Sequence, residues 1–496
     1  MAVAVAPTSA TTRSATELAA AIRAREVSAR DVVEAHIEVL ERFNPAINAV
    51  VYKRFDAARD EADAADEGVA KAEDPEALPP LLGVPCTIKE SIGIEGMPHC
   101  AGVVARRDRR CEGTATIAQR VIDAGAIVLG STNVSELTLW VETENRVYGR
   151  TRNPYDLSRT AGGSSGGEGA AIASGGSVFG LGTDLGGSIR LPAFFNGVFG
   201  HKPSLGLVPA TGLYPAAVGV STRFAVCGPL ARRAEDLMPV LRTIAGPDGE
   251  DETAEEMELG DPQDVSLEGM RVLITDGATL APTSPTLAAA RERASGALAA
   301  AGARLERVSL RNPLRALEIY LTALSTEVGV TAQELLEEAG AERLTWRTAL
   351  RRGGPHTVAT KVALLAERLA ARTPEWRTKR VTASRDAFID ELRGTIGDGV
   401  LLHPPAPRVA PRHGRTVGRI WWVTPMLIFN LAAVPVTQVP LGLDERGLPL
   451  GVQVAAGPGR DHVAIAVALE LERVFGGWVP PSPGTAFGDP APYNRL

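Results

Sequence analysis

A glycine-rich stretch over residues 162–190, GGSSGGEGAAIASGGSVFGLGTDLGGSIR, constrains the fold of this chain more than any other segment. Eleven of its first 26 residues are glycine, yet apolar residues such as Ile172 and Phe179 run through it, so it is expected to pack inside the protein. Glycine permits positive φ angles and close backbone approach. We therefore expect its main-chain N–H groups to lie close to a bound chemical group. Three serines beside glycine pairs are candidate nucleophiles: Ser164, Ser165 and Ser188.

The composition is that of an ordinary globular protein and excludes several classes. Of 496 residues, 45% are hydrophobic and 22% are charged. The net charge of −7 argues against nucleic-acid binding, because no basic surplus is available to neutralise phosphates. The four cysteines make neither a disulfide framework nor a zinc pattern. The N-terminus lacks the basic start of a signal peptide, and no segment reaches the roughly 18 apolar residues of a membrane span. We expect a cytoplasmic protein without an integral membrane segment.

Strand-like apolar runs alternate with helical patterns along the chain, which predicts an α/β fold whose sheet is covered on both faces. Ser28, with Asp31 three positions later, is typical of a helix start. Strands are predicted at 81–89, 126–130, 177–182, 270–276, 400–402, 434–438 and 450–454. Helices are predicted at 15–43 (two helices), 57–73, 114–124, 166–175, 188–195, 284–302 and 461–475.

The region from 312 to 395 is mostly helical in pattern, and an acidic loop occupies 245–265. We expect a single domain over residues 1–496. Its catalytic core would span about 15–240 and 396–480, and a variable helical covering region would span about 245–395.

Three chemistries are open to the glycine-rich stretch. A phosphate-binding loop is disfavoured, because residues 180–186 space their glycines as GxGxxxG and no GxxxxGK[ST] motif occurs. An α/β-hydrolase elbow would make Ser164 of GGSSG the nucleophile, but loop-type residues precede it where a strand is needed. The elbow also needs a histidine, for which the candidates are His201, His403, His413 and His462.

The third chemistry pairs serine with lysine. The chain holds six lysines against 46 arginines, so a lysine in an apolar context is informative. Lys89 ends an apolar run at 81–88, and a desolvated ammonium can lose its proton whereas a guanidinium cannot. Ser188 follows Gly186 and Gly187, beside consecutive N–H groups suited to an oxyanion hole. Ser164 would relay the proton between Ser188 and Lys89.

These segments resemble the amidase signature family. The glycine-rich block matches, as do GVPCTIKE at 83–90, STNVSE at 131–136 and LPLGVQVAAGP at 448–458. Ser164 and Ser188 lie 24 positions apart, and Lys89 and Ser188 lie 99 apart, which is the spacing of that family. The resemblance implies a large mixed central sheet covered by helices on both faces. It is weakest over about 245–400.

The resemblance also implies the role of each residue. Ser188 would form the acyl-enzyme, Lys89 would act as base, and Ser164 would bridge them after a cis peptide bond. The oxyanion would be bound by backbone N–H groups, and Asp184 and Arg190 would brace their loop. Thr138 matches a position whose backbone lies near the substrate. The expected oxyanion donors are Leu185, Gly186, Gly187 and Ser188.

Within the family, GGEGA, GTDLGGSIR and the tail at 461–478 are most similar to the fatty-acid amide hydrolases of the second type. The expected activity is hydrolysis of carboxylic amides to acid and amine, with apolar or aryl acyl groups favoured. No metal or organic cofactor is implied, and a homodimer is a family-level expectation. The main alternative is the A component of a glutamyl-tRNA amidotransferase, although that branch carries Gln-Pro where this chain has Leu191 and Pro192. A catalytically inactive binding protein is disfavoured by the intact lysine and serines.

Overall fold

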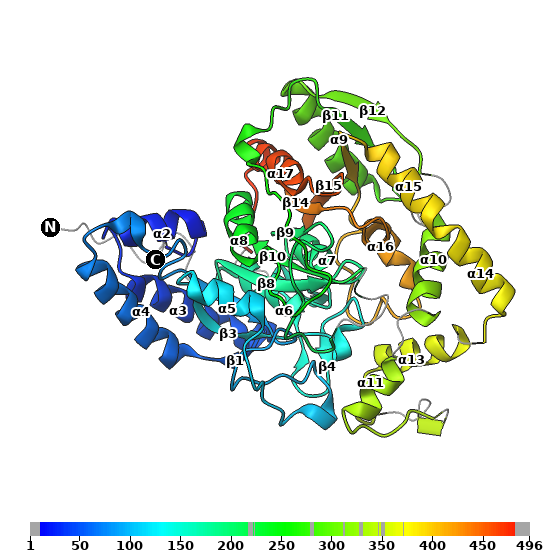
Figure 1. The fold of residues 1–496 in the computed structure, drawn as a ribbon, viewed down its shortest axis with the longest axis horizontal. Helices are drawn as coiled ribbons and strands as arrows, with labels where there is room; N and C mark the ends of the chain where they lie inside the picture. The colour runs from blue at the N-terminus through cyan, green and yellow to red at the C-terminus, as the bar shows by residue number, and fades with distance from the viewer. Residues whose placement is uncertain are drawn as a thin grey trace.

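One mixed sheet of 11 strands runs through the part of the chain described by this computed structural model, which covers residues 10–216, 222, 224–277, 282–310, 313–326, 331–345, 347–348, 353–370 and 372–481 (Figure 1). The strands, in their order across the sheet, are β1 (Val50–Lys53), β3 (Ile127–Thr132), β2 (Pro85–Lys89), β8 (Phe179–Asp184), β10 (Val226–Ala231), β9 (Phe199–Lys202), β14 (Val436–Leu443), β15 (Pro449–Ala456), β13 (Val400–His403), β11 (Arg271–Ile274) and β12 (Arg304–Arg307). Two short ribbons pair β4 (Glu144–Asn145) with β5 (Gly149–Arg150) and β6 (Arg152–Asn153) with β7 (Asp156–Thr160). The predicted α/β class is confirmed.

Fifteen α-helices of the described chain surround this sheet. They are α2 (Ala15–Arg23), α3 (Ala29–Ile47), α4 (Phe55–Lys71), α5 (Thr116–Asp123), α6 (Gly166–Ala173), α7 (Arg190–Phe195), α8 (Leu237–Ile244), α9 (Pro285–Ala300), α10 (Pro313–Thr326), α11 (Ala332–Glu338), α13 (Val358–Ala370), α14 (Glu375–Ala383), α15 (Arg385–Ile396), α16 (Thr424–Leu431) and α17 (Asp461–Phe475). The Ser28 hydroxyl accepts the Asp31 N–H at the start of α3, as its pattern predicts. That helix continues through Pro45 rather than ending there.

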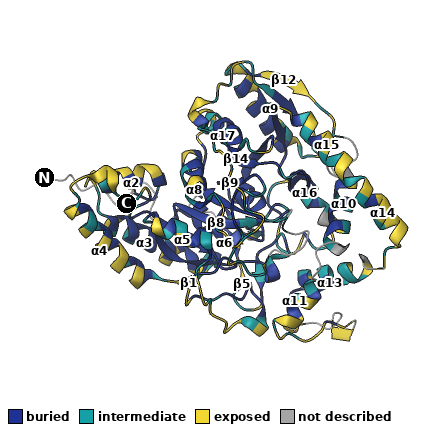
Figure 2. Ribbon diagram, viewed as in Figure 1, coloured by how far each residue is buried: buried dark blue, intermediate teal, exposed yellow. Residues whose placement is uncertain are grey.

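Strand β9 demonstrates that both faces of the sheet are covered, because successive side chains point to opposite faces. His201 bonds Asp461, the first residue of α17, at 3.0 Å. A Cβ placed on Gly200 would lie 2.7 Å from the Ala193 Cβ in α7. Helices α17 and α7 therefore lie on opposite faces. Figure 2 shows the buried strands at the centre and exposed residues along the outer helices.

Helices α10, α11, α13, α14 and α15 form an arc beside the sheet, on the right of Figure 1. This helical cover is shorter than the predicted region of 245–395. Strands β11 and β12 lie within that region but belong to the central sheet, where β11 pairs in parallel with both β12 and β13. The exposed pattern of β12, an edge strand of charged residues, hid it from sequence analysis.

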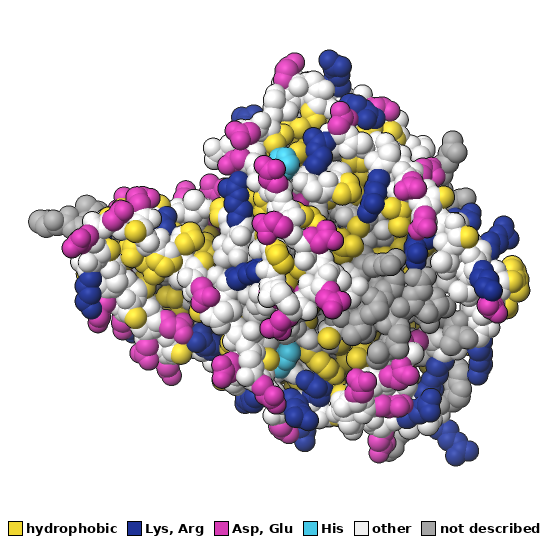
Figure 3. All heavy atoms as spheres, in the orientation of Figure 1, with side chains coloured by type: hydrophobic (Ala, Val, Ile, Leu, Met, Phe, Trp, Pro, Cys, Tyr) yellow, Lys and Arg dark blue, Asp and Glu magenta, His cyan; other side chains and the backbone are white. Residues whose placement is uncertain are grey.

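None of the described helices is both long and apolar enough to cross a membrane. On the face drawn in Figure 3, acidic and basic side chains are interspersed rather than gathered by sign.

Two adjacent parallel strands bring the lysine and serine segments together. Strand β2 pairs with β8 so that Thr87 lies opposite Gly180 and Ile88 opposite Leu181. Lys89 ends β2, and Asp184 ends β8. The carboxyl ends of parallel strands meet at one edge of the sheet, so the lysine and the turn after β8 are brought to one place although they lie far apart in sequence.

We predict that Gly167→Ala destabilises the protein strongly. A Cβ there would lie 2.4 Å from the Asn133 N and 2.9 Å from the Ala49 O, both backbone atoms that cannot move aside easily. Overpacking of this kind costs about 1–3 kcal/mol or more. The matched control is Gly296→Ala, also within a helix but with no heavy atom within 4 Å of the new Cβ. It should stabilise by about 0.5–1 kcal/mol. Urea unfolding of both variants measures the contrast, and equal effects would contradict the prediction.

Candidate active site

Lys89 is the buried centre of the candidate site. It stands at the end of β2 with 0% of its surface exposed. Its Nζ donates to the Ser164 Oγ at 2.7 Å and to the Thr183 Oγ1 at 2.6 Å. Burial lowers the pKa of the Lys89 ammonium to about 7, against the opposing influence of nearby acidic groups. A lysine in this state exchanges a proton readily near neutral pH.

Ser164 is held in a crowded turn before α6. The Gly163–Ser164 peptide bond is cis. A Cβ on Gly163 would lie 2.5 Å from the Trp140 O, so only glycine fits there. Thr143 ties the turn together, because its N–H donates to the Gly162 O and its hydroxyl to the Ser164 O. The Ser164 hydroxyl thus faces Lys89 at a fixed distance.

Ser188 lies in the turn between β8 and α7 and is partly exposed, whereas Ser164 is buried. The two serine segments are joined by the Ser165 N–H, which donates to the Ser188 O at 3.3 Å. The structure therefore brings Lys89, Ser164 and the Ser188 turn together at the ends of β2 and β8. An accessible serine beside a buried serine and lysine suits a nucleophile that receives substrate from outside.

A buried carboxyl lies under this cluster. Glu168 in α6 accepts hydrogen bonds from the Thr87 hydroxyl at 2.7 Å and the Thr132 hydroxyl at 2.8 Å. Burial raises the pKa of Glu168 to about 8. Thr132 lies opposite Lys89 in the sheet, so the carboxyl is adjacent to the lysine strand. Sequence analysis did not single out Glu168, whose signal was an acidic residue in an otherwise apolar helix.

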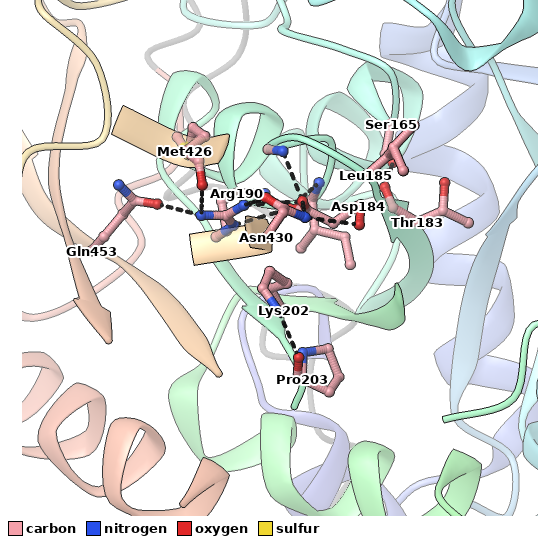
Figure 4. A network of polar contacts seen from close by, with 12 residues as sticks. Ser165, Thr183, Asp184, Leu185, Arg190, Lys202, Pro203, Met426, Asn430 and Gln453 are labelled. Carbon is pink, nitrogen blue, oxygen red and sulfur yellow. Dashed lines mark hydrogen bonds and ion pairs between the residues drawn. The ribbon is translucent and has the colours of Figure 1, made fainter. Parts of the chain in front are cut away.

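Asp184 and Arg190 form a fully buried ion pair that braces the turn between them (Figure 4). The Arg190 Nε and Nη2 each lie 3.0 Å from an Asp184 carboxylate oxygen. The remaining guanidinium hydrogens reach α16 and β15. Their acceptors are the Met426 O, the Asn430 Oδ1 and the Gln453 Oε1.

The expected oxyanion donors differ in one respect from the structure. The Gly187 N–H donates to the Asp184 Oδ1 at 2.7 Å and so is engaged by the brace. Gly187 is instead required for its shape, since its φ is +113° and a Cβ would lie 2.7 Å from the Met426 Cβ. Within the described chain, the N–H groups of Leu185, Gly186 and Ser188 have no acceptor.

Thr138 ends η3 (Glu136–Thr138), beside the loop that packs on Gly163. Its φ is +57°, and its N–H donates to the Ser135 O. The neighbouring Glu136 bonds the start of the cover, where it accepts from the Thr357 N–H and the Thr360 hydroxyl. The Thr138 loop therefore connects the site to the helical cover.

The histidine required by an α/β-hydrolase elbow is placed elsewhere. His201 uses both ring nitrogens, one toward the Thr437 hydroxyl and one toward Asp461. This pair lies on the α17 face of the sheet, while Lys202, the next residue, lies near Asp184 and Arg190 (Figure 4). Ser164 instead bonds a lysine. Among the described residues, no group of three or more His, Cys, Asp or Glu side chains is arranged to hold a metal ion.

With this geometry in place, comparison with known proteins is decisive. The Amidase family model matches residues 31–464. The chain belongs to the Amidase family. Human fatty-acid amide hydrolase 2 is 39% identical over 487 residues, which cover 94% of this chain and 89% of that protein. The A component of the glutamyl-tRNA(Gln) amidotransferase of Synechococcus elongatus is 30% identical over 474 residues, covering 92% and 97%.

Solved structures agree with this amidase assignment. A bacterial aryl acylamidase superposes with a TM-score of 0.80 at 25% identity, covering 93% of this chain and 96% of that chain. The resemblance to the fatty-acid amide hydrolase branch is confirmed, and the protein is an amidase. The residues missed by sequence analysis are Thr183, Tyr320 and Asn430 as well as Glu168. Tyr320 and Asn430 lie far from the motifs in sequence, and only the fold brings them to the site.

We predict that Arg190→Lys destabilises the protein and abolishes amidase activity together. One ammonium cannot replace three guanidinium nitrogens that bond Asp184, Asn430 and Gln453. Disrupting a buried pair costs about 3–5 kcal/mol. The control is Arg473→Lys, whose side chain is 71% exposed in its pair with Glu470. It should change stability by less than about 0.5 kcal/mol. Thermal unfolding and amide turnover of both variants decide, and a stable, active Arg190→Lys enzyme would contradict the assigned brace.

Proposed function

We propose that this amidase cleaves amides of apolar or aromatic acids through an acyl-enzyme formed on Ser188. Ser164 relays the proton, and Lys89 is the general base. The observation that carries the proposal is the buried Lys89 amine, held 2.7 Å from the Ser164 Oγ at the edge where Ser188 is exposed.

The proposed reaction has two stages. The Ser188 oxygen attacks the amide carbonyl carbon while its proton passes through Ser164 to the neutral Lys89 amine. The tetrahedral intermediate then collapses, the C–N bond breaks, and the proton returns to the leaving nitrogen. Water next attacks the Ser188 ester and releases the acid.

The state of Lys89 supports its role as base. A lysine with an ordinary pKa is almost wholly protonated at neutral pH and has no lone pair to offer. Burial lowers the pKa of Lys89 to about 7, so a large fraction is neutral at physiological pH. The neutral amine accepts the Ser164 proton along the same 2.7 Å contact and still donates to Thr183.

The surroundings of the oxyanion turn support an apolar acyl group. Leu185 packs against a hydrophobic cluster that includes Phe224, Ile319, Leu427 and Phe429. An acyl chain bound to Ser188 beside this cluster would gain from apolar burial. The names of two relatives, fatty-acid amide hydrolase 2 and aryl acylamidase, point the same way.

A second candidate is the A component of an amidotransferase, favoured by the 30% identity over 474 residues to the Synechococcus protein. The two functions are separated by substrate and assembly. An amidotransferase component would copurify with other chains and release ammonia from glutamine. The proposed hydrolase acts alone on medium-chain and aryl amides.

Substitution of the three proposed catalytic residues tests the mechanism on an aryl amide such as an octanoyl anilide. Ser188→Ala should abolish turnover, because no other hydroxyl replaces the nucleophile. Lys89→Ala should lower kcat by about 10²–10⁴-fold, the usual contribution of a general base. Ser164→Ala should fall between the two by cutting the relay. A fully active Lys89→Ala enzyme, together with an inactive His403→Ala enzyme, would refute the mechanism.

The pH dependence follows from the same base. Because the amine is active only when neutral, kcat/KM should rise with pH through about 7 and level off above it. Lys89→Ala should remove this limb.

The control for that profile is a second buried lysine. Burial also lowers the pKa of Lys202 to about 7, and its Nζ donates to the Pro203 O. Lys202→Met should keep the limb in kcat/KM. A flat wild-type profile from pH 6 to 9, or loss of the limb in Lys202→Met alone, would contradict the assignment to Lys89.

A further inference from the structure

Tyr320, in helix α10 of the cover, reaches the turn that carries the candidate oxyanion donors. Its hydroxyl donates to the Leu185 O at 2.9 Å. The side chain is 7% exposed, and its ring packs against Phe224 with centroids 5.6 Å apart. Both the ring contact and the helix therefore fix the position of the hydroxyl.

This hydrogen bond orients the Leu185–Gly186 peptide. The bond is trans, since the cis peptides of the described chain are Gly163–Ser164 and Tyr214–Pro215. In a trans peptide the C=O and the N–H point in opposite directions. Holding the Leu185 O toward α10 therefore directs the Gly186 N–H away from α10.

The peptides on either side are held by other groups. The Asn430 side chain donates to the Asp184 O at 3.2 Å, which directs the Leu185 N–H in the same manner. The Gly187 N–H donates to the Asp184 carboxylate. The brace thus holds the first and third peptides of the turn. Tyr320 holds the second, whose Gly186 N–H has no acceptor within the described residues.

We propose that Tyr320 is a positioning residue that preorganises the Gly186 N–H to stabilise the oxyanion formed during amide cleavage. The inference rests on the proposed function of Ser188. It makes the helical cover a contributor to the chemical step, because α10 supplies the hydroxyl that aims a donor. Preorganised donors act on the transition state more than on the bound substrate.

Tyr320→Phe removes the hydroxyl and keeps the ring against Phe224. Without its partner, the Leu185–Gly186 peptide is free to turn, and the Gly186 N–H loses its fixed direction. We expect kcat on an aryl amide to fall about 10- to 100-fold with little change in KM, less than the 10²–10³-fold loss on deleting a donor. Affinity for an aryl boronic acid, which forms a tetrahedral anionic adduct with a serine, should fall by a similar factor. Affinity for the carboxylic acid product should not.

The matched control is Tyr155→Phe. Tyr155 is also a buried tyrosine whose hydroxyl donates to a backbone carbonyl, that of Val479, away from the site. It should lose a comparable amount of stability and keep wild-type kcat and boronic acid affinity. A merely structural role for Tyr320 predicts the same behaviour from both variants.

Gly186→Ala gives a second route if Tyr320→Phe folds poorly. Its Cβ would lie 3.0 Å from the Tyr320 Oη, tight enough to displace the hydroxyl. We expect Gly186→Ala to lower kcat about tenfold or more in the wild-type background and much less in the Tyr320→Phe background. Such non-additivity is the signature of two groups that act through one contact.

The outcomes separate this inference from the proposed function. If wild-type enzyme cleaves no amide, or Ser188→Ala retains full turnover, the proposed function fails. If wild-type is active and Ser188→Ala is inactive, but Tyr320→Phe keeps full kcat and boronic acid affinity, the inference alone is overturned. An effect of Tyr320→Phe on KM only, or strictly additive effects with Gly186→Ala, would also overturn it.

Discussion

The buried ion pair between Asp184 and Arg190 is the interaction on which the site depends. Burial by itself would raise the pKa of the Asp184 carboxyl, but the Arg190 guanidinium outweighs it and holds that pKa below its usual range. Two such charges are stable inside a protein only when their hydrogen bonds are satisfied. The turn between β8 and α7, with α16 and β15, supplies those bonds. The shape of the turn that carries Ser188 is thereby fixed.

The same dry interior treats the two kinds of basic residue differently. Arg190 keeps its charge and serves as a fixed donor, since a guanidinium does not deprotonate in proteins. Lys89 is buried to the same degree with hydroxyl partners rather than a carboxylate, so burial depresses its pKa. A chain that uses arginine almost everywhere therefore places lysine where the proton must leave.

Much of the fold and the central cluster could be predicted from the sequence, because the signals are local. The Ser28 cap, the apolar run ending at Lys89 and the glycine-dense turns state their conformations within a few residues. The edge strand β12 could not be predicted, since it is charged and exposed and lacks an apolar pattern. The engagement of the Gly187 N–H and the approach of Tyr320 were equally hidden. Both depend on where a turn meets distant elements, which no local pattern records.

The brace also has a consequence for the order in which the enzyme becomes complete during synthesis. Lys89, Ser164 and Ser188 all lie in the first 188 residues, but Gln453, which bonds Arg190, follows it by 263 positions. At about 5–20 residues per second, a ribosome needs roughly 13–50 seconds to cover that interval. For that time the emerging polypeptide holds its nucleophile and base without the C-terminal contacts that shape the oxyanion turn. Hydrolytic competence is thus gained only as the last strands join the sheet, and a truncated product retains reactive groups without the geometry to use them.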